Sequence, residues 1–276
     1  MNKRDAHLTL QYTVIDEHVI REALENERDL EVKSKQEGNS RGNQATDNRN
    51  GKTSTREVIR FEEVQCLRLS YKNLLRIDNL VGLKCIHTLC LDNNVIEEIE
   101  NLGHLVNLQW LDLSFNNIKK IQGLENLTQL KDLSLYSNNI EVIENLELSP
   151  NLECLSIGRN KINKLENLLY LRQFKKLRLV TLDGNPVCKD PEYRMYVLAY
   201  LDCLKYLDYA LVEKNEIISA REQYQDELLE AHERDLLEEA NEKTIIQHQE
   251  YLAKLKNAQH HPARRQALAS LGKGRE

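Results

Sequence analysis

Seven side chains belong to the types that dominate protein–protein binding, namely aromatic rings, arginine guanidiniums and a carboxylate. Trp, Tyr and Arg supply most of the binding energy at protein interfaces, so the chemistry that these residues suggest is noncovalent recognition of another polypeptide. They fall within a regularly repeating part of the sequence, and they are Arg68, Tyr71, Trp110, Asp112, Phe115, Tyr136 and Arg159.

Motifs for catalysis are missing from the sequence. It contains no Gly-x-x-x-x-Gly-Lys phosphate loop, no Gly-x-Gly-x-x-Gly fingerprint, no His-Glu-x-x-His metal pair and no Gly-x-Ser-x-Gly nucleophile elbow. The eight histidines are scattered, and the pair His260-His261 lies in a polar tail. We therefore expect a protein that is not an enzyme and that uses no metal and no cofactor.

Charge and hydropathy argue against two further classes, nucleic-acid-binding proteins and membrane proteins. Among 276 residues, 38 Lys and Arg face 44 Asp and Glu, which gives a net charge of −6 and argues against a nucleic-acid binder. No stretch reaches the ~20 consecutive apolar residues that a bilayer span requires, so we expect no membrane association. The six cysteines form no Cys-x-x-Cys pair, and we expect all of them to be reduced.

The feature that must position the seven side chains is a repeat. Six copies begin at residues 64, 86, 108, 130, 152 and 177, with spacings of 22, 22, 22, 22 and 25 residues. The fourth copy shows the pattern, with Leu133, Leu135, Asn138 and Ile140 at offsets 3, 5, 8 and 10 from Leu130. The two leucines alternate on a short strand and point inward, while the amide of Asn138 can bond the backbone where the chain leaves the strand.

This pattern is that of the leucine-rich repeat, and it predicts an α/β solenoid shaped as a horseshoe. Six stacked copies place their strands in one parallel sheet on the hollow face. The seven residues occupy the solvent-facing offsets 2, 4, 6 and 7, so Trp110 and Phe115 should project from that face. A rival interpretation is that these two rings merely pack on each other.

An open solenoid needs a cover at each end. At the front, Ser54-Thr55-Arg56-Glu57 has the spacing of a capping box and predicts a short covering helix. At the back, Asp190-Pro191 predicts a helix from Glu192 to Leu201. The leucine-rich repeat domain with its caps should therefore span residues 54–209, six repeats followed by the C-terminal cap.

Four segments flank this domain. We expect an N-terminal helix within residues 1–33, running from Thr13 to Val32, and a disordered polar linker over 34–53. Residues 210–258 should form one long acidic α-helix, and a polar tail follows over 259–276. Residues 211–258 hold twelve acids and six bases, with paired apolar steps whose separations are not heptads. The helix either docks back on the cap or packs against partner helices, as in a coiled coil.

Several stretches resemble known families. The 22-residue spacing with its cap is similar to the class typified by the protein phosphatase-1 regulatory repeat subunit. The sequences at 74–80, 110–118, 168–174 and 195–209 more specifically resemble the dynein regulatory complex subunit 3 family. Two features depart from that family: a polar insert at about 39–53, and a tail that stops at Glu276.

The resemblance implies a non-catalytic scaffold or adaptor of the nexin-dynein regulatory complex, which links doublet microtubules in motile cilia and flagella. It implies location in the axoneme, a cytoskeletal structure, with other subunits of that complex as partners and helical partners along 211–258. One rival function is a regulator that docks a phosphatase catalytic subunit. A second rival, an RNA-binding adaptor, requires a basic face, which the net charge opposes.

Overall fold

A computed structural model describes residues 12–26 and 60–259. The chain divides into two compact units, residues 1–220 and 221–276. The polar linker expected at 34–53, the capping box at 54–57 and the tail beyond residue 259 lie outside the described residues.

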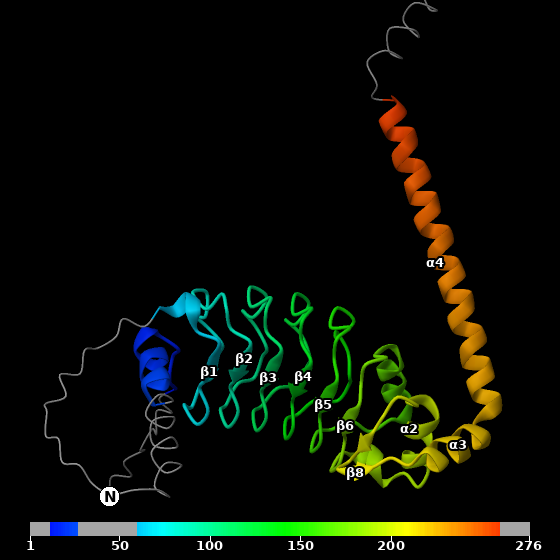
Figure 1. The fold of residues 1–276 in the computed structure, drawn as a ribbon, viewed down its shortest axis with the longest axis horizontal. Coiled ribbons are helices and arrows are strands. Elements are labelled where there is room, and N and C mark those ends of the chain that lie inside the picture. Colours follow the sequence, from blue (N-terminus) through cyan, green and yellow to red (C-terminus); the bar gives the residue numbers. More distant parts are fainter. Residues whose placement is uncertain (1–11, 27–59, 260–276) are drawn as a thin grey trace, which may run out of the picture. The chain divides into compact units, whose positions relative to one another are not determined.

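The first unit is a solenoid built on one sheet (Figure 1). Its strands pair in chain order, and β1 to β7 are parallel. Successive coils are in register, so that Leu67 pairs with Leu89 and Leu89 with Leu111. The predicted leucine-rich repeat horseshoe is confirmed. The strands are β1 (Cys66–Arg68), β2 (Thr88–Cys90), β3 (Trp110–Asp112), β4 (Asp132–Ser134), β5 (Cys154–Ser156), β6 (Leu179–Thr181), β7 (Tyr206–Leu207) and β8 (Ala210–Leu211).

The repeated aliphatic positions form the core. The central residue of each strand from β1 to β7 is buried, or the second residue where the strand has two. Two expected core positions, Val64 and Leu165, are only half-buried. Val64 directly follows the short 3-10 helix η1 (Phe61–Glu63), before the first strand, and Leu165 begins the 3-10 helix η2 (Leu165–Gln173).

A column of buried asparagines binds neighbouring coils together. Asn116 accepts a hydrogen bond from the backbone N–H of Ile96 (3.0 Å) and donates to the carbonyls of Leu91 and Leu113 (both 3.0 Å). Each amide therefore satisfies backbone groups of its own coil and of the preceding one. The same arrangement recurs at Asn94, Asn138, Asn160 and Asn185.

The front cover comes from the N-terminal segment. Thr13 forms a parallel bridge with Leu74, and the side chain of Asn79 donates to the carbonyl of Ile15 (2.7 Å). The following helix begins at Glu17 and not at Thr13, because the Asp16 carboxylate caps the N–H of Val19 (2.9 Å). The apolar stripe expected over Thr13–Val32 also included Leu30, which lies outside the described residues. Its other members are all buried, namely Ile15, Val19, Ile20, Ala23 and Leu24.

The back cover differs slightly from the expectation. Asp190 accepts a hydrogen bond from the N–H of Glu192 (2.9 Å), a 3-10 helix η3 (Pro186–Lys189) precedes it, and α2 spans Tyr193–Tyr200. The chain then forms a hairpin, because Asp208 and Tyr209 both have positive φ (49° and 65°), as a type I′ turn requires. Residues 210–211 consequently form β8, which pairs antiparallel with β7, so the predicted start of the long helix at 210 is wrong.

The C-terminal part contains two helices in place of the single expected one. Helix α3 spans Lys214–Gln223 and α4 spans Gln225–Gln259, with an interruption at Tyr224. Exposed apolar side chains occur along α4, including Leu229, Leu236, Leu237, Ile245 and Ile246. None of the helices within the described residues is both long and apolar enough to span a bilayer.

Candidate functional site

The seven residues singled out from the sequence all lie on the hollow side of the sheet or at its strand ends. The side chains of Trp110 and Phe115 are 45% and 47% exposed, and Tyr71 is 77% exposed. Neither Trp110 nor Phe115 is therefore part of the core. The remaining four divide into two exposed arginines, Arg68 and Arg159, and two half-buried residues, Asp112 and Tyr136.

Tyr136 is the centre of a cluster that brings three of the seven residues together. Its ring lies 5.8 Å from the ring of Phe115, with the two planes tilted by 59°. The guanidinium carbon of Arg159 lies 5.7 Å from the Tyr136 ring centroid, within the range of a cation–π contact. Among the described aromatic residues, Phe115 thus has its ring partner in Tyr136 and not in Trp110.

Two further residues of this cluster, Asp183 and Tyr209, are not among the seven predicted from the sequence. The hydroxyl of Tyr136 donates to Oδ2 of Asp183 (3.4 Å), while Oδ1 of Asp183 is buried without a hydrogen-bond partner. Partial desolvation and the negative charge of Asp183 raise the pKa of Tyr209 to about 12, although most of the Tyr209 side chain is exposed. Asp183 has offset 6 in the sixth repeat, so extending the same offsets would have found it.

The backbone holds several of these side chains in an unusual conformation. Tyr71, Phe115 and Arg159 all occupy offset 7 and have φ values of 58°, 54° and 50°. The left-handed region costs an L-residue roughly 1–2 kcal/mol, and bulky residues are rare there. Hydrogen bonds between coils maintain it, as from the N–H of Phe115 to the Tyr136 carbonyl (2.8 Å).

Gly158 allows the cluster to close. A Cβ at this position would lie 2.6 Å from the Tyr136 ring and 2.5 Å from Oδ1 of Asp183, both too close for any real side chain. Because Gly158 has no side chain, the Tyr136 ring of the fourth coil and the Asp183 carboxylate of the sixth coil can approach each other over the fifth coil.

Trp110 lies in an acidic environment. Its partners in the two neighbouring strands are Thr88 and Asp132. Asp112, two residues further along β3, is on the same face of the sheet and accepts a hydrogen bond from the N–H of Ser114 (2.9 Å). Burial and the negative charge of Asp112 raise the pKa of Asp132 above its usual value.

The cysteines on the strands are free thiols, as are the other three. Burial raises the pKa of the Cys90 thiol to about 11, so little of it is the reactive thiolate at neutral pH. Within residues 12–26 and 60–259, no group of three or more His, Cys, Asp and Glu side chains could hold a metal ion.

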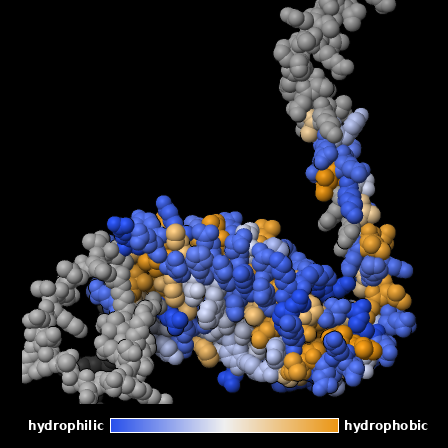
Figure 2. Space-filling model, viewed as in Figure 1, coloured by the Kyte–Doolittle hydropathy of each residue, from blue (hydrophilic) through white to orange (hydrophobic). Residues whose placement is uncertain are grey.

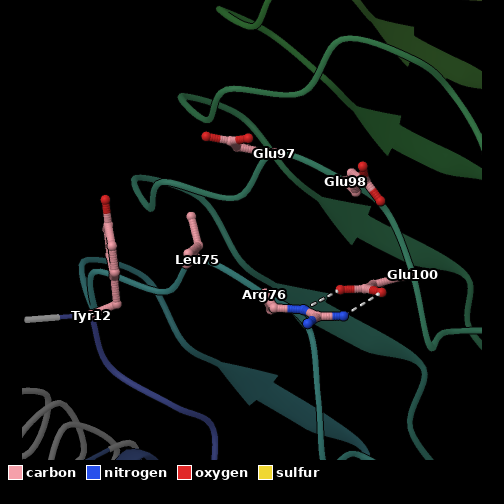
Figure 3. Close-up of a pocket in the computed structure, with 6 residues that line it drawn as sticks. All are labelled: Tyr12, Leu75, Arg76, Glu97, Glu98 and Glu100. Atoms are coloured by element: carbon pink, nitrogen blue, oxygen red, sulfur yellow. Dashed lines mark hydrogen bonds and ion pairs between the residues drawn. The ribbon is translucent and has the colours of Figure 1, made fainter.

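A pocket near the front of the solenoid lies away from the seven residues. Tyr12, Leu75, Arg76 and three glutamates line it, with the guanidinium of Arg76 bonded to both carboxylate oxygens of Glu100 (2.9 and 3.2 Å) (Figure 3). The other two glutamates that line the pocket, Glu97 and Glu98, are exposed.

Surface hydropathy is uneven over the first unit. In the view of Figure 2 most of the surface is hydrophilic, and hydrophobic residues gather near the end that carries α2 and β8. Exposed apolar or aromatic side chains at that end include Tyr206, Tyr209 and Leu211. This end adjoins the Tyr136 cluster through Asp183.

Comparison with curated proteins gives relatives that share one name. Dynein regulatory complex subunit 3 of Homo sapiens is 41% identical over 85 residues, which cover 30% of this chain and 16% of the human protein. The protein of the same name in Mus musculus is 44% identical over 63 residues, 22% of this chain and 12% of the mouse protein. The aligned part is thus a small fraction of each relative's length.

Solved structures that match part of this chain include the SNF/U2A′ complex of Drosophila melanogaster. It is 34% identical, with a TM-score of 0.46, over 50% of this chain and 86% of the solved chain. An internalin of Listeria monocytogenes is 24% identical, with a TM-score of 0.47, over 57% of this chain and 52% of its own.

The family assignment follows from the sequence model and the fold together. A family model described as leucine-rich repeat matches residues 96–236, about half of the chain. The matched stretch contains the strands from β3 to β8, and its coils show the in-register leucines and buried asparagines described above. The chain belongs to the leucine-rich repeat family.

Proposed function

We propose that this chain is a non-catalytic scaffold or adaptor of the axonemal nexin-dynein regulatory complex, in cilia or flagella. The observation that carries the proposal is its identity of 41–44% to dynein regulatory complex subunit 3. The exposed aromatic residues on the hollow face support it, because such residues mark protein interfaces.

In this scaffold the solenoid is the rigid part. Its strands are tied by in-register hydrogen bonds and by the asparagine column, so the hollow face is pre-organised. A partner subunit that binds there loses little free energy in ordering the solenoid. The exposed apolar residues of α4 are available for helical partners in the same complex.

The direct test is retention on axonemes. Tagged full-length protein should remain with detergent-stripped axonemes through a salt wash and should cross-link to subunits of the regulatory complex. Loss of the wild-type protein in the wash would contradict the proposal. Recovery of a phosphatase catalytic subunit in place of axonemal subunits would favour a phosphatase-docking regulator.

A paired variant locates the binding face. Replacement of Trp110 and Phe115 by alanine should abolish retention, because it removes two half-exposed rings, one on the first residue of β3 and one just after its end. The matched control replaces Val106 and Val142, which are exposed to a similar degree and lie outside the strands. Retention of the Trp110 and Phe115 variant would exclude the hollow face as the partner site.

A further inference from the structure

We infer that the hollow face binds a basic amphipathic segment of its partner, with a basic side chain placed over Trp110 between Asp112 and Asp132. The apolar side of the segment would then contact Phe115 and Tyr136. This inference rests on the proposed function, because it names the chemistry of the partner subunit.

The aromatic surface provides the apolar part of the site. Phe115 and Tyr136 are in ring contact and follow the C-terminal ends of β3 and β4, whereas Trp110 is the first residue of β3. Rings at this exposure lose hydrating water on docking, at about 25 cal/mol per Å² of apolar surface buried. A partner segment with one apolar side therefore fits this part of the surface.

Charge identifies the other side of the segment. Asp92, Asp112 and Asp132 lie on three successive coils, and offsets 2, 4, 6 and 7 of these three coils hold no Lys, Arg or His; Arg68 belongs to the preceding coil. Asp92 accepts hydrogen bonds from neutral side chains, Ser70 and Asn93. These three coils therefore present a negatively charged part of the hollow face, which favours a cationic partner group.

Trp110 makes the site specific for a basic side chain placed at one point. Adjacent parallel strands are about 4.8 Å apart, so the carboxylates of Asp132 on β4 and Asp112 on β3 both flank the indole. A guanidinium or ammonium stacked on the indole face gains a cation–π interaction, and its remaining N–H groups can donate to the two carboxylates. A cation there also relieves the repulsion that raises the pKa of Asp132.

The same charges disfavour two other occupants. Residues 211–258 carry twelve acids and six bases, so the helical region of a second copy would meet the carboxylates with like charge. A nucleic acid would be repelled for the same reason. A partner segment that combines arginine or lysine with apolar residues remains the best match.

Tryptophan fluorescence tests the inference, because Trp110 is the only tryptophan in the chain. The full-length protein is titrated with a capped alanine-based helical peptide that carries arginines on one side and leucines on the other. A second peptide has glutamate in place of each arginine. The arginine peptide should change the Trp110 emission at concentrations where the glutamate peptide does not, and added salt should weaken its binding.

Two charge-neutralised variants separate the site from general electrostatics. Asp112→Asn with Asp132→Asn keeps side-chain shape and should weaken the arginine peptide roughly tenfold or more. Glu97→Gln with Glu98→Gln removes the same charge from exposed residues at the front pocket and should leave the affinity unchanged. Equal weakening by both pairs, or no weakening by the first, would overturn the inference.

Other outcomes are equally decisive. An equal response to both peptides would show that charge does not select the occupant. Emission that changes with protein concentration alone, with a dimer in sedimentation, would show that a second copy occupies the face. Wild-type retention on axonemes with undiminished retention of the Asp112→Asn, Asp132→Asn variant would reject this inference and leave the proposed function standing.

Discussion

The rings of Phe115 and Tyr136 lie 5.8 Å apart although the two residues belong to successive coils of the solenoid. Phe115 reaches this position from a left-handed backbone, with φ at 54°, and its N–H donates to the carbonyl of Tyr136. Side-chain contact and backbone strain thus occur at the same residue. The same left-handed φ recurs at offset 7 of the neighbouring coils, at Asn93 (55°) and Ser137 (57°), so the coil geometry sets the backbone and Phe115 is the bulky residue that occupies this position in its coil.

Substitution of Phe115 by glycine and by alanine should separate these effects. Both variants lose the ring and should lose partner retention. Glycine relieves the left-handed strain whereas alanine keeps it, so Phe115→Gly should be more stable than Phe115→Ala by about 0.5–1 kcal/mol. Urea unfolding measures the difference, with Ser137→Gly (φ 57°) as a control that changes stability at the same offset and leaves binding intact. Greater stability of the alanine variant would contradict the strain.

Leu111→Ala tests the register of the repeat. Leu111 is fully buried at the centre of β3, so its truncation leaves a cavity and should cost about 2–5 kcal/mol. Calorimetry measures the loss, and Val106→Ala at an exposed position should stay within about 0.5 kcal/mol. Equal effects of the two substitutions would mean that Leu111 is not a core position.

The repeated part of the fold could be predicted because every coil has the same residue pattern and packs only against the coils next to it. The period predicts that Trp110 and Phe115 lie outside the core, and the structure leaves both about half exposed. The contact of Phe115 with Tyr136, and not with Trp110, could not be foreseen. It depends on the direction in which a left-handed residue projects its side chain.

The ends of the domain were harder to predict because they occur once and have no period. Residues 12–26 cover the front through the bridge at Thr13 and the hydrogen bond from Asn79 to Ile15, and their helix is capped by Asp16, a signal that is common in many sequences. The hairpin at Asp208 and Tyr209 lacks the glycine that usually marks a type I′ turn. Its turn is favoured by tertiary bonds, since Asp208 also accepts from the N–H of Leu182 (2.6 Å).

Asn116→Ala should destabilise the solenoid by at least about 2 kcal/mol. The substitution leaves the N–H of Ile96 and the carbonyls of Leu91 and Leu113 without their partner in a buried place. Chemical denaturation followed by circular dichroism measures the loss. The neighbouring Asn117 is exposed, and Asn117→Ala should change stability by less than about 0.5 kcal/mol. A loss at Asn116 no larger than at Asn117 would show that the asparagine column does not hold the coils together.

The back cover should lose stability when the Tyr193 hydroxyl is removed and when the pH becomes alkaline. The hydroxyl of buried Tyr193 donates to the Asp208 carboxylate (2.6 Å), and that carboxylate also accepts from the backbone N–H of Asp183 (2.9 Å). Tyr193→Phe should cost about 1.5–3 kcal/mol at pH 7, because it removes a hydrogen bond to a charged acceptor. The exposed Tyr71→Phe should cost less than about 0.5 kcal/mol.

The pH dependence of this loss follows from the Tyr193 pKa. Burial, reinforced by the charge of Asp208, raises that pKa above the usual 10, so the folded protein keeps the phenol protonated where the unfolded chain ionises. The stabilisation is fully present below pH 10 and declines as pH rises above it, by up to about 1.4 kcal/mol per pH unit. The stability difference between the wild type and Tyr193→Phe, measured by urea unfolding from pH 7 to 11, should therefore shrink above pH 10. A difference that stays constant would mean that Tyr193 titrates alike in both states and that its bond to Asp208 does not fix the cap.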